Sequence, residues 1–122
     1  MNWTLDKSRP ICPQICELIC AAVANGEFSA GERLLSVREI ALLAGVNPNT
    51  VQKSLEELER CGVIHSVRCS GWYVNENTDA ATKELKSLRI KKTEEYLVEM
   101  AQLGCTADDI IKYINECQGG KQ

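Results

Sequence analysis

Four hydrogen-bonding side chains lie close together near the middle of the chain, with no acidic residue among them. Asn49, Thr50, Gln52 and Lys53 occupy exposed positions at the start of an expected helix over residues 48–60. Their amide, hydroxyl and ammonium groups suit the edges of DNA bases and phosphate oxygens. The exposed positions of the second half carry glutamates instead. Since the start of a recognition helix is the part that reads the groove, this distribution predicts a DNA-reading surface.

The residues before this helix predict a helix-turn-helix. Ser36, with Glu39 three residues later, forms a capping box that begins a first helix. Gly45 permits the tight turn that ends it. Asn47 then caps the second helix, whose first residue is Pro48. Free N–H groups at the start of this second helix would suit a phosphate.

A β-hairpin is expected directly after the two helices. Residues 63–67 are rich in β-branched side chains and alternate, residues 68–71 form a polar turn, and residues 72–74 return as a second strand. Arg68 stands at the tip, where its cation would meet a phosphate or enter the minor groove. Such a hairpin after a helix-turn-helix is the layout of a winged helix. An ordinary small α+β domain is the alternative.

Charge gives DNA binding no general support. The net charge is −3, and residues 1–75 carry seven Lys and Arg against eight Asp and Glu. Affinity would therefore have to come from locally placed cations. The cations on the segments expected to meet a duplex are Arg33, Arg38, Lys53 and Arg68.

Composition indicates one compact domain with a small appendage. The chain has 122 residues, of which 44% are apolar. Its start lacks the basic and apolar runs of a signal peptide, and no apolar stretch approaches the about 20 residues of a membrane helix. A cytoplasmic protein with no membrane partner is expected.

The cysteines allow two interpretations. There are seven of them, and in a cytoplasmic protein they are expected as thiols. Cys12, Cys16 and Cys20 recur along the flank of an expected first helix, either as small hydrophobic residues at the edge of the core or as a thiolate metal or redox sensor. No cluster has zinc spacing, so no metal or cofactor is predicted. His65 lacks a neighbouring acid, and no catalytic residue or enzymatic activity is expected.

Residues 76–122 are expected to form a helical segment. One helical pattern covers residues 80–103, and a capping box at Thr106 and Asp109 opens a last helix. The residues of this last helix expected to face inward are Ile110, Ile111, Ile114 and Cys117. Two helices cannot bury their apolar stripes alone, so packing on the winged domain or on a partner chain is expected. Residues 119–122 are expected to fray.

Three motifs between residues 3 and 74 show a family resemblance. Residues 3–15 (WTLDKSRPICPQI) form a lead-in to the first helix, residues 26–41 follow the pattern G-x-L-x-x-G-x-x-L-P-S-x-R-x-L-A, and residues 46–51 (VNPNTV) begin the recognition helix. Together they resemble the GntR family of bacterial transcription regulators, in its YtrA-type branch. Leu35 replaces the usual proline, and Cys69 stands where the wing tip usually has glycine, with a Cβ that opposes a positive φ.

The resemblance implies a fold and a function. The fold is mainly α with a small β-hairpin: a winged helix-turn-helix domain over residues 1–75, then a C-terminal helical dimerisation segment over residues 76–122. The function is sequence-specific transcriptional regulation, with a repressor binding a palindromic operator as a homodimer, often at a transporter operon. Whether a small-molecule effector binds stays open. Its expected place would be the dimer interface or the space between the C-terminal segment and the winged domain.

The resemblance also implies roles for individual residues. Arg38 and the start of the recognition helix would face DNA, Arg33 and Ser36 would hold phosphates, and the turn of the hairpin would form a wing contact. The full set of candidate DNA-binding residues is Arg33, Ser36, Arg38, Asn47, Asn49, Thr50, Gln52, Lys53, Arg68, Ser70 and Gly71.

Two alternatives to this function remain. A winged-helix protein-interaction module without DNA contacts is favoured by the acidic isoelectric point and by Leu35 and Cys69, and disfavoured by Arg38 and the acid-free start of the recognition helix. A thiol- or metal-responsive form of the regulator is the other.

Overall fold

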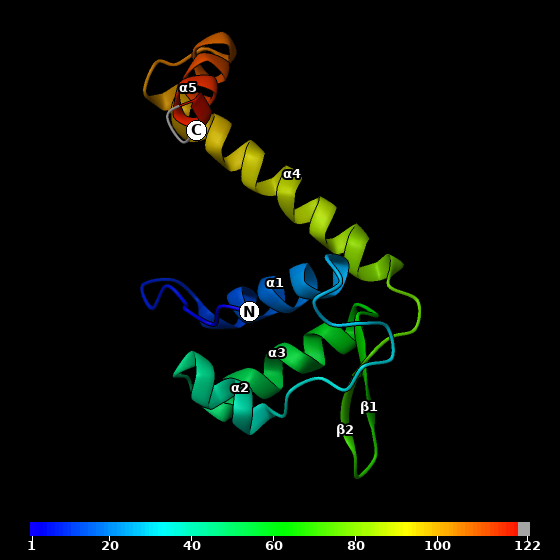
Figure 1. Cartoon of the computed structure of the whole chain (residues 1–122). Helices are drawn as coiled ribbons and strands as arrows, with labels where there is room; N and C mark the ends of the chain where they lie inside the picture. Colours follow the sequence, from blue (N-terminus) through cyan, green and yellow to red (C-terminus); the bar gives the residue numbers. More distant parts are fainter. Residues whose placement is uncertain (120–122) are drawn as a thin grey trace. The chain divides into compact units, whose positions relative to one another are not determined.

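The computed structural model describes residues 1–119, which form five helices and one hairpin (Figure 1). In chain order the elements are α1 (Ile11–Ala24), α2 (Val37–Ala44), α3 (Pro48–Arg60), β1 (Ile64–Val67), β2 (Gly71–Val74), α4 (Asp79–Gln102) and α5 (Ala107–Gly119). The expected mainly helical fold with a small hairpin is confirmed. Gly119, expected to fray, is the last residue of α5, and residues 120–122 lie outside the described part of the chain.

The chain divides into two compact units. The first covers Met1–Lys86 and the second begins at Ser87, so that α4 runs across the division. The first unit holds the three N-terminal helices and the hairpin, and we refer to it as the winged unit. In residues 1–119 no helix combines the length and apolar character needed to cross a membrane.

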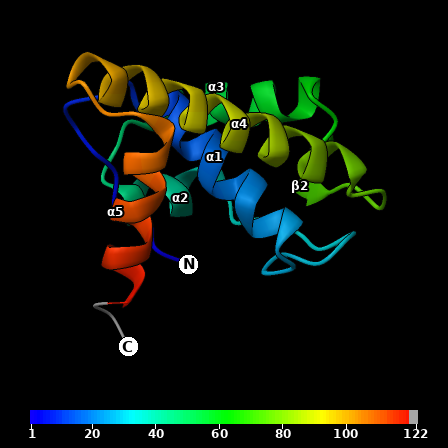
Figure 2. The ribbon, with the colours of Figure 1, turned by 90° about the horizontal axis from the view of Figure 1, so that it is seen from above.

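Packing of α1 against α3 forms the centre of the winged unit. The two helices lie side by side in both views (Figures 1 and 2). Ile15 and Ile19 of α1 are fully buried, as are Val51 and Leu55 of α3. Each pair is spaced by four residues, which puts its members on one helix face. Fully burying such side chains stabilises a fold by about 1.5–3 kcal/mol each, so this contact anchors α3.

A polar contact lies inside the same packing. Ser54 of α3 is fully buried, and its hydroxyl donates to the carbonyl oxygens of Thr50 at 3.0 Å and Cys12 at 3.3 Å. The Cys16 thiol donates to the carbonyl oxygen of Ser54 at 3.4 Å. Buried polar groups cost free energy unless they are paired, so these bonds favour one alignment of α3 along α1.

The caps of the helix-turn-helix are those expected from the sequence. Ser36 Oγ accepts from the Glu39 N–H at 3.1 Å, and a Glu39 carboxylate oxygen accepts from the Ser36 N–H at 3.1 Å, which completes the capping box of α2. Gly45 ends α2 with a φ of 67°, a left-handed conformation that glycine adopts without a steric penalty. The Asn47 side chain then caps α3, whose first residue is Pro48, by accepting from the Asn49 N–H.

The hairpin is held on both sides. Its antiparallel register pairs Ile64 with Val74 and Val67 with Gly71. Residues 31–34 run along β2, with the Leu34 N–H donating to the Trp72 carbonyl at 2.8 Å. On the other side, a carboxylate oxygen of Glu59 in α3 accepts from the N–H and the hydroxyl of Ser66, at 2.9 and 3.0 Å. The wing is thereby fixed to the recognition helix.

The second unit leaves most of its apolar side chains exposed. The expected capping box of α5 is present, with the Asp109 N–H donating to Thr106 Oγ1 at 3.2 Å and the Thr106 N–H donating to an Asp109 oxygen at 3.1 Å. Ile110 is buried. Ile111, Ile114 and Cys117, which were also expected to face inward, are exposed in the single chain, so the second unit alone does not cover them. Two helices can cover only the strip between them.

Candidate nucleic-acid interface

The first turns of α3 present polar side chains on the face away from α1. Asn49 and Lys53 are exposed, and Thr50 and Gln52 are half-buried. The next acid along this face is Glu56, whose carboxylate accepts from Gln52 Nε2 at 3.1 Å. That bond leaves the second N–H and the carbonyl oxygen of the Gln52 amide for other partners. The start of α3 therefore offers donors and acceptors from Asn49 to Lys53, and the first carboxylate beside them is that of Glu56.

The backbone at the start of α3 is already satisfied. Asn47 Oδ1 accepts from the Asn49 N–H at 2.8 Å, and the Asn47 carbonyl accepts from the N–H groups of Thr50 and Val51 at 3.0 and 3.3 Å. Pro48 has no N–H to offer. The expectation of free N–H groups at this helix start is wrong because the Asn47 cap occupies them. Contacts with a phosphate here would have to come from side chains.

The start of α2 is similar. The Ser36 hydroxyl serves the capping box, and the hydrogen bond from the Ser36 N–H lowers the pKa of the Glu39 carboxyl. Glu39 is thus ionised at neutral pH and sits where an incoming phosphate would otherwise meet the helix end. A phosphate bound near Ser36 would be repelled by this carboxylate and would need a cation beside it. Arg38 is exposed on the same helix.

Arg33 links the segment before α2 to the wing. Its guanidinium donates to the Ser70 carbonyl at 2.6 Å. Gly71 leaves room for this contact: a Cβ at Gly71 would lie 3.3 Å from Arg33 Nε, and the backbone there has a φ of 136°. The Ser70 hydroxyl is hydrogen-bonded to the Tyr73 hydroxyl. The structure therefore brings Arg33, Ser70 and Gly71 together, and the Arg33 guanidinium has a structural partner besides any phosphate.

The wing tip carries an exposed cation and a strained residue. Arg68 and Cys69 are both exposed. Cys69 adopts a φ of 64°, the left-handed conformation that its Cβ was expected to oppose. Left-handed backbone costs an L residue about 1–2 kcal/mol. The hairpin geometry thus overrides the local preference at this position.

Two arginines of the winged unit are paired with carboxylates, whereas the cations of the expected DNA face are not, among the residues that the structure describes. Arg9 is paired with Asp6, and Arg60 with Glu57. Within residues 1–119, Arg38, Lys53 and Arg68 form no ion pair. Three exposed cations, on α2, α3 and the wing, are thus available to phosphates.

Sequence reasoning does not identify the role of Glu59, one of the glutamates in the second half of α3. Its carboxylate holds the first wing strand through Ser66. No local sequence pattern predicts the contact between Glu59 and Ser66, because it depends on how the hairpin folds back onto α3.

The buried thiols fit a packing role. Burial raises the pKa of Cys16 to about 12 and that of Cys20 to about 11. Both thiols are therefore protonated at neutral pH, and the thiolate is the reactive and metal-binding form. Among residues 1–119 no group of three or more candidate ligands is placed to hold a metal ion.

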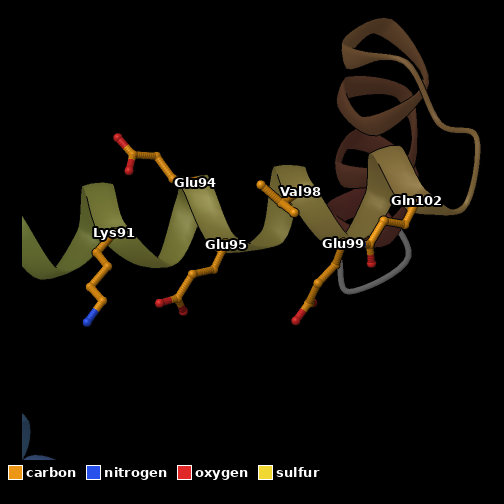
Figure 3. A pocket seen from close by; sticks show the side chains of 6 residues that line it. All are labelled: Lys91, Glu94, Glu95, Val98, Glu99 and Gln102. Atoms are coloured by element: carbon orange, nitrogen blue, oxygen red, sulfur yellow. The ribbon is translucent and has the colours of Figure 1, made fainter.

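The depression that the structure shows on α4 is not an enclosed ligand site (Figure 3). All the residues that line it come from one helix, and three of them are glutamates. Lys91, Glu95 and Glu99 project to one side of α4 (Figure 3). Small-molecule sites are concave and mostly apolar, so this charged face gives an effector no support.

Comparison with known proteins places the chain among bacterial regulators. Residues 13–74 match the family model for bacterial regulatory proteins of the gntR family. The HTH-type transcriptional repressor YtrA of Bacillus subtilis is 33% identical over 120 residues, covering 94% of this chain and 92% of YtrA. The uncharacterized HTH-type transcriptional regulator YhcF of the same species is 31% identical over 114 residues, covering 93% of this chain and 94% of YhcF.

A solved structure gives the same result. A GntR family transcriptional regulator from Listeria monocytogenes superposes with a TM-score of 0.80 at 35% identity, covering 92% of this chain and 98% of that one. The winged-helix fold is thereby confirmed. These relatives are named as transcriptional regulators and not as enzymes.

Replacing Cys69 by glycine should stabilise the protein. Glycine adopts the left-handed conformation without strain, which stabilises the folded state. This gain should exceed the entropic cost of ordering a glycine on folding, for a net stabilisation of about 0.5–1 kcal/mol. Urea unfolding at fixed protein concentration measures this difference. Cys69→Ala is the control, since it removes the thiol and keeps the Cβ. Equal stabilities for the two variants would mean that the wing tip is not strained.

Proposed function

We propose that this protein, which belongs to the GntR family of DNA-binding transcriptional regulators, acts as a homodimeric repressor that binds a palindromic operator. In this proposal residues 1–75 read DNA and residues 76–122 form the dimer. Binding to an operator implies action in the cytoplasm. The name of the relative YtrA, a transcriptional repressor, supports repression. A transporter operon as the target is supported by the resemblance to YtrA-type regulators alone.

The observation that carries the proposal is the face shared by α2, α3 and the wing. Its cations are unpaired in the described residues, and the start of α3 has no acid. Arg68 and Lys53 would contact phosphates, which position the protein, and Asn49, Gln52 and Arg38 would contact base edges, which specify the sequence. Ser36, Asn47, Thr50, Arg33, Ser70 and Gly71 complete the proposed contact set.

The exposed apolar residues of the second unit support a homodimer. The large ones are Ile90, Tyr96, Leu97, Val98, Leu103, Ile111, Tyr113 and Ile114. Residues 89–99 of α4 are exposed without interruption, and a helix without tertiary packing is marginal in water. A second copy would cover these side chains, and helix-turn-helix dimers bind two half-sites related by the same two-fold symmetry.

Replacing Arg38 by alanine should weaken operator binding. A base-reading contact is worth about 1–3 kcal/mol, so the loss should be about 5- to 150-fold. Fluorescence anisotropy with labelled operator measures the affinity, and circular dichroism checks the fold. Arg60→Ala is the matched control, because it removes the same charge from the far end of α3, where Arg60 is paired with Glu57. Equal losses in both variants would mean that Arg38 makes no base contact, and a wild-type protein that binds no duplex would favour the protein-interaction module.

Replacing Leu97 by glutamate should convert the dimer into a monomer. Leu97 is 42% exposed in the single chain, so the change should not disturb the monomer fold but would bury a charge in the dimer. Light scattering at micromolar concentration gives the mass. The control is Leu42→Glu at a leucine that is 80% exposed on α2, where the dimer mass should persist. A monomeric wild-type protein would contradict the dimer outright.

A further inference from the structure

Residues 1–9 precede Pro10, the cap of α1, and we call them the N-terminal arm of the winged unit. Trp3 and Leu5 are only 7% and 9% exposed. They belong to the same hydrophobic cluster as Ile40 and Ala44 of α2. Because these large side chains are removed from water, the arm is held against the helix-turn-helix.

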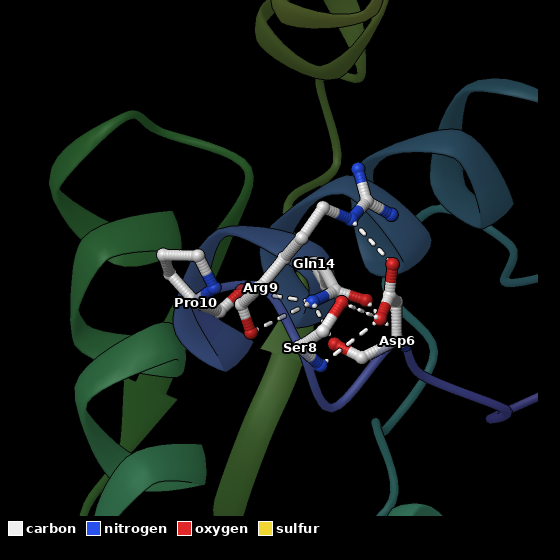
Figure 4. A network of polar contacts seen from close by, with 5 residues as sticks. All are labelled: Asp6, Ser8, Arg9, Pro10 and Gln14. Atoms are coloured by element: carbon white, nitrogen blue, oxygen red, sulfur yellow. Dashed lines mark hydrogen bonds and ion pairs between the residues drawn. The ribbon is translucent and has the colours of Figure 1, made fainter.

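A polar network closes the base of the arm (Figure 4). The Gln14 side chain accepts from the Asp6 N–H at 2.8 Å and donates to the carbonyl oxygens of Asp6 and Pro10, both at 2.9 Å. The Asp6 carboxylate accepts from the Ser8 N–H at 3.0 Å and from Arg9 Nε at 2.9 Å. Hydrogen bonds from Ser8 are the main cause that lowers the pKa of Asp6. The Gln14 bonds thus fix the loop that contains Lys7 to α1, and the exposed Arg9–Asp6 pair within the arm adds little to them.

From this loop, Lys7 reaches the turn of the helix-turn-helix. Its ammonium donates to the Ala44 carbonyl at 2.8 Å and to the Gly45 carbonyl at 3.1 Å. The last carbonyls of a helix have no partner within the helix and carry its partial negative charge. Lys7 therefore satisfies the end of α2 at the point where the chain turns toward α3.

We propose that Lys7 is a positioning residue for DNA recognition. Its ammonium holds the backbone at Ala44 and Gly45, and Asn47, which caps α3, follows only two residues later. The direction in which α3 leaves the turn is fixed by this clamp, and with it the positions of Asn49 and Gln52 against the base edges. Lys7 acts through the turn and does not contact DNA. The inference rests on the proposed function, since it needs a DNA sequence to be read.

If Lys7 acts in this way, its loss should reduce the preference for the operator over random DNA more than it reduces the affinity for DNA in general. Hydrogen bonds to base edges depend steeply on distance and angle, whereas attraction to phosphates depends chiefly on charge. A loosened turn would therefore impair binding to the operator and leave binding to random DNA nearly unchanged.

Arg9 provides a matched control in the same arm. It is exposed, it is paired with Asp6, and it lies two residues after Lys7. Lys7→Gln and Arg9→Gln remove the same charge from the arm, so their effects on counterion release and steering should be alike. Only Lys7→Gln removes the contact with the turn.

The experiment compares the full-length wild type with Lys7→Gln, Arg9→Gln and Lys7→Arg. Affinity is measured by anisotropy for an operator selected from random DNA and for a scrambled duplex, at a temperature where circular dichroism shows every variant folded. Lys7→Gln should lower the ratio of the two affinities about fivefold or more, the size expected for one impaired base contact. Arg9→Gln should change the ratio less than about twofold on the same scale. Lys7→Arg should restore it, because a guanidinium also donates to carbonyls.

Hydrogen exchange provides a readout that does not involve DNA. The Val46 N–H donates to the Ala41 carbonyl at 3.1 Å across the turn. Its exchange should be faster in Lys7→Gln than in Arg9→Gln, because only the first variant releases the turn.

Two results would overturn the inference. The first is the same affinity ratio for Lys7→Gln and Arg9→Gln. The second is an equal loss on both duplexes with a smaller salt dependence in Lys7→Gln, since that would show a direct phosphate contact. A wild-type protein that binds no duplex in preference to another would instead contradict the proposed function, which separates that failure from a failure of the Lys7 clamp.

Discussion

Packing of α3 against α1 determines which side chains of the recognition helix are exposed on the surface of the protein. Val51 and Leu55 are fully buried in this contact, and Ser54 between them is bonded to the backbone of α1. A helix has only one angular position that satisfies all three residues. That position turns Asn49 and Lys53 outward. The cap of α3, the turn before it and the wing bound to it all depend on this orientation, which the buried apolar side of α3 sets.

The electrostatics of the protein follow from how few cations it has. With a net charge of −3, no broad positive field attracts DNA, and binding has to rely on individual contacts. Two arginines outside the proposed interface, Arg9 and Arg60, are paired with neighbouring carboxylates. A protein of this kind depends on accurate placement of its hydrogen-bonding groups. The proposed function would therefore depend also on contacts that orient the interface, such as those of Glu59 and Lys7.

Local sequence patterns predicted most of the winged unit. The capping box at Ser36, the glycine turn and the hairpin were all inferred correctly, because each depends on residues within a few positions of one another. Contacts between distant residues were not predicted. Lys7 and Ala44 are 37 positions apart, as are Arg33 and Ser70, and only the folded chain brings them together. The expectation of free N–H groups at the start of α3 was wrong because Asn47 binds them: its side chain accepts from the Asn49 N–H, and its carbonyl accepts from those of Thr50 and Val51. For Ile111 and Ile114, periodicity showed an apolar face but could not show what covers it.

The central claim, that this surface reads DNA as a symmetric dimer, is tested most directly by selecting bound sites from random double-stranded DNA with the full-length protein. The account predicts enrichment of one palindromic sequence, whose two half-sites are separated by about one helical turn or a multiple of it, 10–10.5 base pairs per turn. Recovery of no enriched sequence would contradict DNA reading by this surface. Enrichment of a single half-site without symmetry would contradict the dimer.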